Sequence, residues 1–412
     1  MTGAQGDPIV LTRHDDLRDA YRSKDLRQGG YDEGAVVTAG TLLDLHGDEH
    51  RDRRRLENRL FRRETFRHYE RDVLPPRIAE VVQPAIADGH GDLVSIGRRT
   101  VVNLTAEIAG LDRVEGTAEE TDVLHQLAMK FSEGATLVHS ARNKEEVRAE
   151  VRQALDLMDQ RFLQPSIERR RKLLDGFAAG SIPESYLPVD VLTTLLRNED
   201  KLALPSDVVK REVALYLQAG SHSTSNAFAH TMHLLFGWFD GHPDGRDRVL
   251  SSRLFAQRCF HEALRLHPAS PVATRRALAP VTLRSATVIP QGATVVLDLT
   301  AANRDQLIWG HTAAQFDPDR TVPTGMMAWG NSFGGGVHAC IGMELDGGIE
   351  PNDNDPASEH LMGTVALLVE AVMAGGARPD PLHPPVPDTS TTRVNWSSYP
   401  VLFSPPPTGS PS

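Results

Sequence analysis

The spacing of apolar and polar residues predicts a mainly α-helical chain with a small β-rich part. Apolar residues recur at helical spacing over residues 15–26, 70–87, 92–110, 121–134, 144–174, 205–239, 251–267 and 359–374. Short alternating runs predict strands over residues 8–12, 281–283, 287–289 and 294–299, and around 395–396 and 401–403. Segments 28–40 and 178–188 are predicted loops. We therefore expect a single, mainly α domain over residues 1–412, with a Pro/Ser-rich tail at 404–412.

Composition narrows the class of protein. The chain has 412 residues, of which 40% are hydrophobic, so it can bury a sizeable core. Its formal net charge of −11 argues against nucleic-acid binding. The two cysteines lie far apart and form neither a disulfide framework nor a zinc motif, which suits a reducing compartment. We find no signal peptide or membrane-spanning stretch, and expect a soluble, monomeric protein of the cytoplasm.

The segment 333–342, Phe-Gly-Gly-Gly-Val-His-Ala-Cys-Ile-Gly, carries the strongest chemical signal. Three consecutive glycines permit positive φ angles and close approach to a flat ligand. Cys340 follows, and residues 341–345 are predicted to open a helix. A cysteine at a helix start meets unpaired N–H groups and the positive end of the helix dipole, both of which favour the thiolate. His338 adds a hydrogen-bond donor or a positive charge.

The pattern Phe-x-x-Gly-x-His-x-Cys-x-Gly resembles the haem-binding signature of the cytochrome P450 family at every fixed position. The resemblance implies a mainly α, cytochrome P450-like fold and a haem b cofactor. It also implies that Cys340 is the proximal thiolate ligand of the haem iron, and that Phe333, Gly334, His338 and Gly342 belong to the cofactor site.

A second motif lies in an arginine cluster, seven arginines between residues 51 and 63. His50 and Arg54 stand at i and i+4, so they share one helix face. The resemblance implies that this pair holds a haem propionate, and that Arg275, with Arg276 as the alternative, holds the other. The remaining arginines form either a solvated helix face or a docking surface for an acidic electron donor. Few residues precede this motif, so we expect a reduced N-terminal lobe or a reading frame that starts short.

The centre of the predicted helix 205–239 resembles the family's oxygen-side helix, which carries a small residue, Gly, any residue, an acid and Thr. Ala219 and Gly220 match this pattern, but His222 occupies the acid position and Ser223 the threonine position. Serine can donate and accept a proton, and histidine can shuttle one near neutral pH. Thr224 or Ser225 takes over if the helix register differs. The alternative for His222 is a histidine with no relay role.

Two further segments complete the resemblance. Glu262-x-x-Arg265 and the later Arg320 match a buried ion network that fixes the cysteine loop in the family, a structural role. After the cysteine, residues 347–358 form an acidic insertion that could alter docking of an electron donor.

We therefore expect a haem-thiolate monooxygenase that oxidises a small organic molecule in secondary metabolism. It would use dioxygen and electrons from NAD(P)H, delivered through a ferredoxin and its ferredoxin reductase. Two alternatives remain open. The departures at His222 and Ser223 are compatible with a peroxide-driven, coupling or dehydrating haem-thiolate enzyme, and the motifs alone are compatible with a non-catalytic haem-binding protein.

Overall fold

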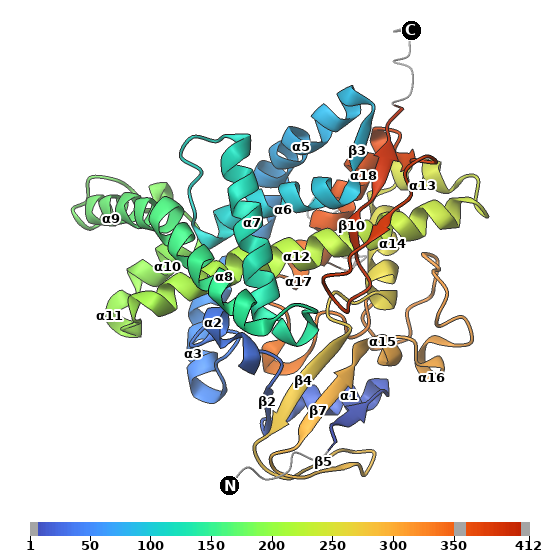
Figure 1. Ribbon diagram of the computed structural model, residues 1–412, viewed down its shortest axis with the longest axis horizontal. Helices are drawn as coiled ribbons and strands as arrows, with labels where there is room; N and C mark the ends of the chain where they lie inside the picture. Colours follow the sequence, from blue (N-terminus) through green and yellow to red (C-terminus); the bar gives the residue numbers. More distant parts are fainter. Residues whose placement is uncertain (1–6, 350–359, 405–412) are drawn as a thin grey trace.

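The computed structural model describes residues 7–349 and 360–404, and it shows the predicted fold class, many helices and small sheets (Figure 1). The α-helices are α1 His14–Arg22, α2 Ala35–Thr38, α3 Gly47–Glu57, α4 Arg63–His68, α5 Leu74–Asp88, α6 Leu93–Ala109, α7 Ala118–Ala135, α8 Lys144–Met158, α9 Gln164–Ala178, α10 Val191–Arg197, α11 Glu199–Leu202, α12 Ser206–Phe239, α13 Gly245–Ser251, α14 Arg253–Leu266, α15 Leu299–Ala302, α16 Gln306–Trp309, α17 Met343–Gly347 and α18 Thr364–Ala374. The strands are β1 Ile9–Leu11, β2 Leu26–Gln28, β3 His90–Asp92, β4 Val272–Ala277, β5 Val281–Thr282, β6 Val288–Ile289, β7 Thr294–Asp298, β8 Arg378–Pro379, β9 Val386–Pro387, β10 Trp396–Ser398 and β11 Pro400–Leu402. In the described residues, no helix is both long and apolar enough to cross a bilayer.

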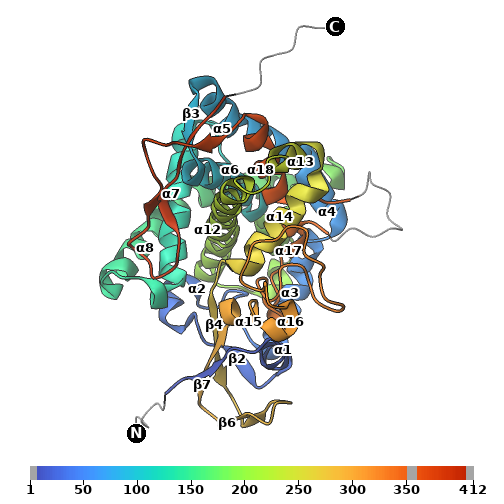
Figure 2. The same cartoon turned by 90° about the vertical axis from the view of Figure 1, so that its right-hand side faces the viewer.

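Helix α12 runs through the middle of the molecule, and α6, α7, α14 and α18 pack around it (Figure 2). Its 34 residues begin after Pro205, which occupies the N-cap position. Helix α6 approaches most closely, because a Cβ at Gly220 would lie 2.8 Å from Thr105 Cγ2. Asp92 caps the start of α6 and Gly110, with φ +90°, ends it. The sequence thus fixes both the length of α6 and its distance from α12.

The β-rich part contains a four-stranded sheet in the order β1-β7-β4-β2 (Figure 1). Strand β1 is parallel to β7, and the other neighbours are antiparallel. Arg275 and Ala277 are buried on one face of β4, whereas Arg276 points away from them and donates to the carbonyl of Gly292. Strand alternation therefore selects Arg275, rather than Arg276, as the arginine on the protein side of the sheet.

The prediction of one continuous helix over residues 144–174 is wrong, because a π-helical turn at Asp159–Leu163 separates α8 from α9. A second π turn, Tyr69–Val73, precedes α5. Each turn lies two residues before a proline, Pro165 or Pro75. A proline lacks the N–H that would bond the carbonyl four residues earlier and its ring crowds that carbonyl, so the preceding turn widens.

Other differences are local. The predicted helix 15–26 ends at Arg22, because Leu26 pairs with Ala277 as part of β2. The predicted loop 28–40 contains α2 and a 3₁₀ turn. Helix α18 begins at Thr364, and most of the predicted insertion 347–358 lies outside the described residues.

The predicted Glu-Arg-Arg network is confirmed. Glu262 accepts two hydrogen bonds of 2.7 Å from Arg265 and one of 3.0 Å from Arg320. Arg265 is fully buried and also donates to the carbonyls of Asn303 and Ala313, at 2.6 and 2.7 Å. The network joins α14 to the segment that leads to the cysteine loop, so it holds that segment in place.

We expect Arg265→Leu to lower the free energy of unfolding by about 3–5 kcal/mol, because it leaves the buried Glu262 carboxylate short of a partner. Urea denaturation measures the change. The matched control is Arg258→Leu on the same helix, whose exposed pair with Asp319 at 3.4 Å contributes at most about 1 kcal/mol. Equal losses in the two variants would contradict the buried role.

A second buried network ties α3 to α12. Glu57 Oε2 accepts a hydrogen bond of 2.5 Å from the Tyr216 hydroxyl, and Arg53 pairs with Glu212 at 2.9 Å. Both carboxylates are fully buried, and Glu57 Oε1 has no partner in the described part of the chain. Burial raises the pKa of Glu57 to about 7, against the opposing effects of Tyr216 and Arg53. The carboxyl is therefore favoured in its protonated form.

Because the folded protein keeps a proton that the unfolded chain loses, the free energy of unfolding should fall as pH rises from about 4.5 to about 7. Glu57→Gln should flatten this dependence and be more stable than the wild type above pH 7, by at most about 3 kcal/mol. Denaturation curves across this pH range test it, with the exposed Glu49→Gln as control. A Glu57→Gln variant that keeps the wild-type slope is the contrary result.

Candidate active site

Cys340 lies in a loop that folds back on itself after a 3₁₀ turn, Gly336–His338. Its backbone N–H donates to the carbonyl of Phe333 at 2.8 Å. Gly334 and Gly336 have φ angles of +70° and +65°, and a Cβ at Gly336 would collide with the carbonyl oxygen of Tyr21. The glycines are thus required by backbone conformation and by close contact with α1.

The Cys340 thiol borders open space, yet burial raises its pKa to about 11. The N–H of Gly342 and the charge of Arg54 act in the opposite direction. The expectation that a helix start favours the thiolate is wrong here, because α17 begins three residues later, at Met343, and burial dominates. A bound metal ion would reverse this balance, since it stabilises the thiolate directly.

Positive or hydrogen-bonding groups from three elements gather beside this loop. The rings of His50 and His338 lie 4.1 Å apart, and Arg54 Nη2 donates to the carbonyl of Ala339 at 2.6 Å. Burial and the charges of His50, Arg275, His46 and Arg54 lower the pKa of His338 to about 3. The structure therefore brings together His50, Arg54, Arg275 and His338, as predicted.

These groups have no internal counter-charge. Within residues 7–349 and 360–404, no carboxylate forms a salt bridge with Arg54 or Arg275, and His338 Nε2 and His46 Nδ1 are buried without a hydrogen-bond partner. A buried polar atom without a partner costs about 1–3 kcal/mol. The cluster is therefore suited to a ligand that carries negative charge.

One face of α12 is open in the middle of an otherwise buried helix. Ala219 is exposed although Glu212 to Gln218 are buried, and Ser223, one turn later, is partly exposed. Ser223 Oγ donates to the carbonyl of Ala219 at 2.7 Å. Gly220 points away from this face, toward α6. Ala219 and Ser223 thus border the open space directly, whereas Gly220 permits helix packing.

His222 is a neutral residue in this structure. Burial, followed by the charges of Arg393 and Arg98, lowers its pKa to about 3. Its Nε2 lies 3.1 Å from Asn226 Nδ2, so Nε2 accepts and the ring proton is on Nδ1. The expectation of a histidine that titrates near neutral pH is wrong, because two arginines and no paired carboxylate surround it.

The two alternative hydroxyls point elsewhere. Thr224 forms a hydrogen bond with the side chain of Asp346 on α17, and burial raises the pKa of Asp346 to about 7. Ser225 Oγ donates to the carbonyl of Ser221 at 2.6 Å. Only Ser223 of the three faces the open space, so the expected helix register holds. This interaction links α17 to α12 at one point.

Sequence reasoning missed Asp346, Tyr31 and Arg393. Asp346 acts electrostatically on Cys340, and Tyr31 interacts with Arg275, Arg393 and Cys340. No motif marks these residues. An acid within the predicted helix after Cys340 was the one available signal for Asp346.

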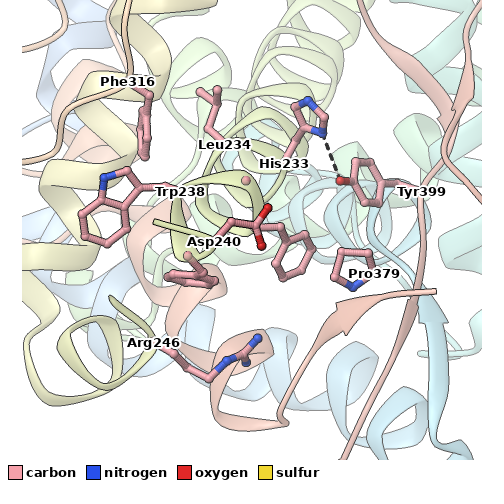
Figure 3. A pocket seen from close by; sticks show the side chains of 11 residues that line it. His233, Leu234, Trp238, Asp240, Arg246, Phe316, Pro379 and Tyr399 are labelled. Carbon is pink, nitrogen blue, oxygen red and sulfur yellow. Dashed lines mark hydrogen bonds between the residues drawn. The ribbon is translucent and has the colours of Figure 1, made fainter. Parts of the chain in front are cut away.

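A separate pocket of about 700 Å³ opens at the far end of α12 (Figure 3). It is lined by His233, which lies 3.0 Å from the Tyr399 hydroxyl, and by Trp238, Asp240 and Arg246. His233 is ten residues beyond Ser223, about 15 Å along the helix. This pocket is thus distinct from the space between Cys340 and α12.

The comparisons agree with this arrangement. The cytochrome P450 family model matches residues 246–345. Putative cytochrome P450 133B2 of Xylella fastidiosa is 33% identical over 158 residues, 38% of this chain and 37% of that protein. Echinocystic acid 23-monooxygenase of Saponaria officinalis is 26% identical over 352 residues, 76% of this chain and 66% of that protein. The matches thus span from about a third to two thirds of these relatives.

The fold is shared over nearly the whole chain. P450BioI, solved with a hexadec-9Z-enoic acid-ligated acyl carrier protein, superposes with a TM-score of 0.73 at 17% identity, over 97% of this chain and 94% of that one. CYP164A2 of Mycobacterium smegmatis gives 0.69 at 19% identity, over 96% and 90% of the two chains. These likenesses establish the fold.

Cytochromes P450 hold haem b through a cysteine thiolate. The residues here fit that group. The glycine loop leaves Cys340 exposed, and α12 presents the small residues Ala219 and Ser223. Arg54, Arg275 and the unpaired His338 Nε2 suit the two haem carboxylates. Residues 246–345 are thus similar to the cytochrome P450 family, and the whole chain shares the fold of solved cytochromes P450.

Proposed function

We propose that the protein is a haem-thiolate monooxygenase that oxidises a small organic molecule. The observation that carries this proposal is the exposed Cys340 in its glycine loop, near Arg54 and Arg275, which have no carboxylate partner in the described residues. The exposed Ala219 and the partly exposed Ser223, on an otherwise buried helix, support it. When bound, haem with a thiolate ligand supplies dioxygen activation and the transfer of one oxygen atom to the substrate.

The proposed roles follow from position. Cys340 provides the thiolate sulfur, which the N–H of Gly342 stabilises, and Phe333 and Gly334 shape the loop around it. Arg54 and Arg275 hold the carboxylates of the cofactor by charge-assisted hydrogen bonds, and the neutral imidazoles of His50 and His338 add N–H donors. Ala219 borders the open space without filling it, and Gly220 lets α12 pack closely against α6.

Ser223 is the proposed proton donor. Its hydroxyl keeps its proton shared with the carbonyl of Ala219 and faces the open space, so it can pass that proton on and take another from solvent. His222 orients this turn through its bond to Asn226, and Thr224 anchors the turn to Asp346. Neither side chain is placed to deliver a proton at Ser223.

Electrons would come from NAD(P)H through an acidic ferredoxin and its reductase. The enzyme would be a monomer in the cytoplasm and would act in secondary metabolism. The support is a basic surface near the cysteine loop. Arg55, Arg59, Arg62 and Arg63 are exposed, and Arg63 lies 3.4 Å from Glu344 on α17. Opposite charge steers and orients such encounters.

A peroxide-driven or coupling enzyme is the second candidate. The neutral His222 at the usual acid position favours it, because the usual acid for proton delivery is missing. Turnover with hydrogen peroxide, but none with ferredoxin, its reductase and NADPH, would select it.

We expect Cys340→Ala to abolish the red-shifted band that the carbonylated ferrous protein shows with thiolate ligation, because no other described cysteine lies near the site. Absorption spectra of the haem-loaded protein measure this. Cys259→Ala is the matched control: Cys259 is buried in α14 and should leave the band unchanged. A Cys340→Ala variant with the wild-type band would refute the proposed ligand.

We expect Ser223→Ala to lower the ratio of product formed to NADPH consumed by about tenfold or more, with the difference released as hydrogen peroxide. A compound that shifts the spin state of the haem-loaded protein serves as substrate. Thr224→Val, which removes the hydroxyl bonded to Asp346, should change stability more than this ratio. An unchanged ratio in Ser223→Ala would exclude its role.

A further inference from the structure

The turn between β9 and β10 is held firmly over α12. Its Ser390 and Thr392 bond the backbone of residues 139–141, with Ala141 N–H donating to Ser390 O at 3.2 Å and Thr392 N–H donating to His139 O at 3.1 Å. His230 of α12 lies 2.8 Å from the carbonyl of Val394. The main chain on both sides of Arg393 is therefore fixed in relation to α12.

Arg393 has no partner for its charge. Its Nε is buried without a hydrogen bond, and within the described ranges its guanidinium forms no salt bridge. Burial lowers its pKa, as expected for a cation removed from water without compensation. Arg393 as a whole is partly exposed, but its Nε is buried, and charged groups largely removed from water are normally paired. The missing partner therefore points to a ligand.

The groups around Arg393 come from separate elements, and they are neutral. Arg393 interacts electrostatically with Tyr31, His139 and His222. Burial raises the pKa of Tyr31 and lowers those of His139 and His222, to about 4 and about 3. The neighbouring Asp388 is occupied by its own turn, since its Oδ1 accepts from the N–H and hydroxyl of Ser390 at 2.9 and 2.6 Å.

We propose that Arg393 binds the carboxylate of an organic-acid substrate above the open face of α12. This inference rests on the proposed function, and it names the class of substrate. The planar guanidinium matches a carboxylate with two parallel hydrogen bonds, and burial strengthens them. Tyr31 and His139 lie where neutral donors or acceptors can complete the site, and the fixed turn keeps Arg393 pre-organised.

Binding of a cofactor carboxylate by Arg393 fits less well, and so does Arg98 as the cation that binds the substrate. The charges that act on His338, where the cofactor carboxylates are proposed to bind, come from His50, Arg275, His46 and Arg54. Arg393 does not act on His338 there; it acts on His139 and His222, and it shares Tyr31 with Arg275. Arg98 also has a buried, unpaired Nε, but two acids, Asp388 and Asp92, act on it. Of these two arginines, Arg393 has the less compensation.

The experiment uses probes that bind the haem iron through an imidazole nitrogen, so that it needs no knowledge of the natural substrate. A series of ω-(imidazol-1-yl)alkanoic acids of increasing chain length is titrated into the haem-loaded protein, each beside its methyl ester. We expect at least one chain length at which the acid binds about tenfold tighter than the ester. Arg393→Gln should abolish this preference, and Arg393→Lys should keep part of it.

The matched control is Arg284→Gln, an arginine on the exposed surface, which should retain the full preference. A wild-type protein that shows no acid preference at any chain length overturns the proposal, as does an Arg393→Gln variant that keeps the preference. Loss of haem in Arg393→Gln would also overturn it, by assigning the side chain to the cofactor. The red-shifted band of the carbonylated ferrous protein distinguishes failure of the proposed function from failure of this inference. A wild-type protein without this band contradicts the proposed function. A wild-type protein that shows the band but no acid preference contradicts this inference alone.

Discussion

Positive charge removed from water, with no carboxylate to balance it, is the constraint on which this site depends. His50 and Arg54 reach it from α3, Arg275 from β4, and His338 from the cysteine loop. Each support is itself fixed, α3 by its buried tie to α12 and the loop segment by the Glu262 network. Arg54 and Arg275 carry the positive charge, whereas His50 and His338 are neutral, since their pKa values are lowered to about 4 and about 3. An anionic cofactor supplies the counter-charge that the two arginines lack.

Local spacing explains why much of the site could be predicted. The i, i+4 relation of His50 and Arg54, the alternation along β4 and the glycines of the loop all depend on a few adjacent residues. The long helix α12 and the Glu262-x-x-Arg265 pair could be predicted from the sequence for the same reason. The protonation states of the site residues could not be predicted in this way. Burial and neighbours from distant segments decide the pKa values of Cys340 and His222, and both differ from the sequence-based expectation.

Side-chain direction was also beyond local pattern. The sequence placed Ser223 at the threonine position and left Thr224 and Ser225 as alternatives for a different helix register, and successive residues on a helix diverge by about 100°. Only the packing of α6 and α17 against α12 shows which direction is open. Likewise, Arg393 belongs to a turn without a motif, and its position above α12 depends on bonds to residues more than 150 positions away.

Gly220 has a consequence for how such sequences are compared. Its missing side chain makes room for the methyl group of Thr105, so the residue is required by the distance between two helices. A match at this position therefore reports that the scaffold is assembled in the same way. Such a match gives no information about the reaction. A chain could keep this glycine while the residues at positions 222 and 223, and with them the chemistry, change.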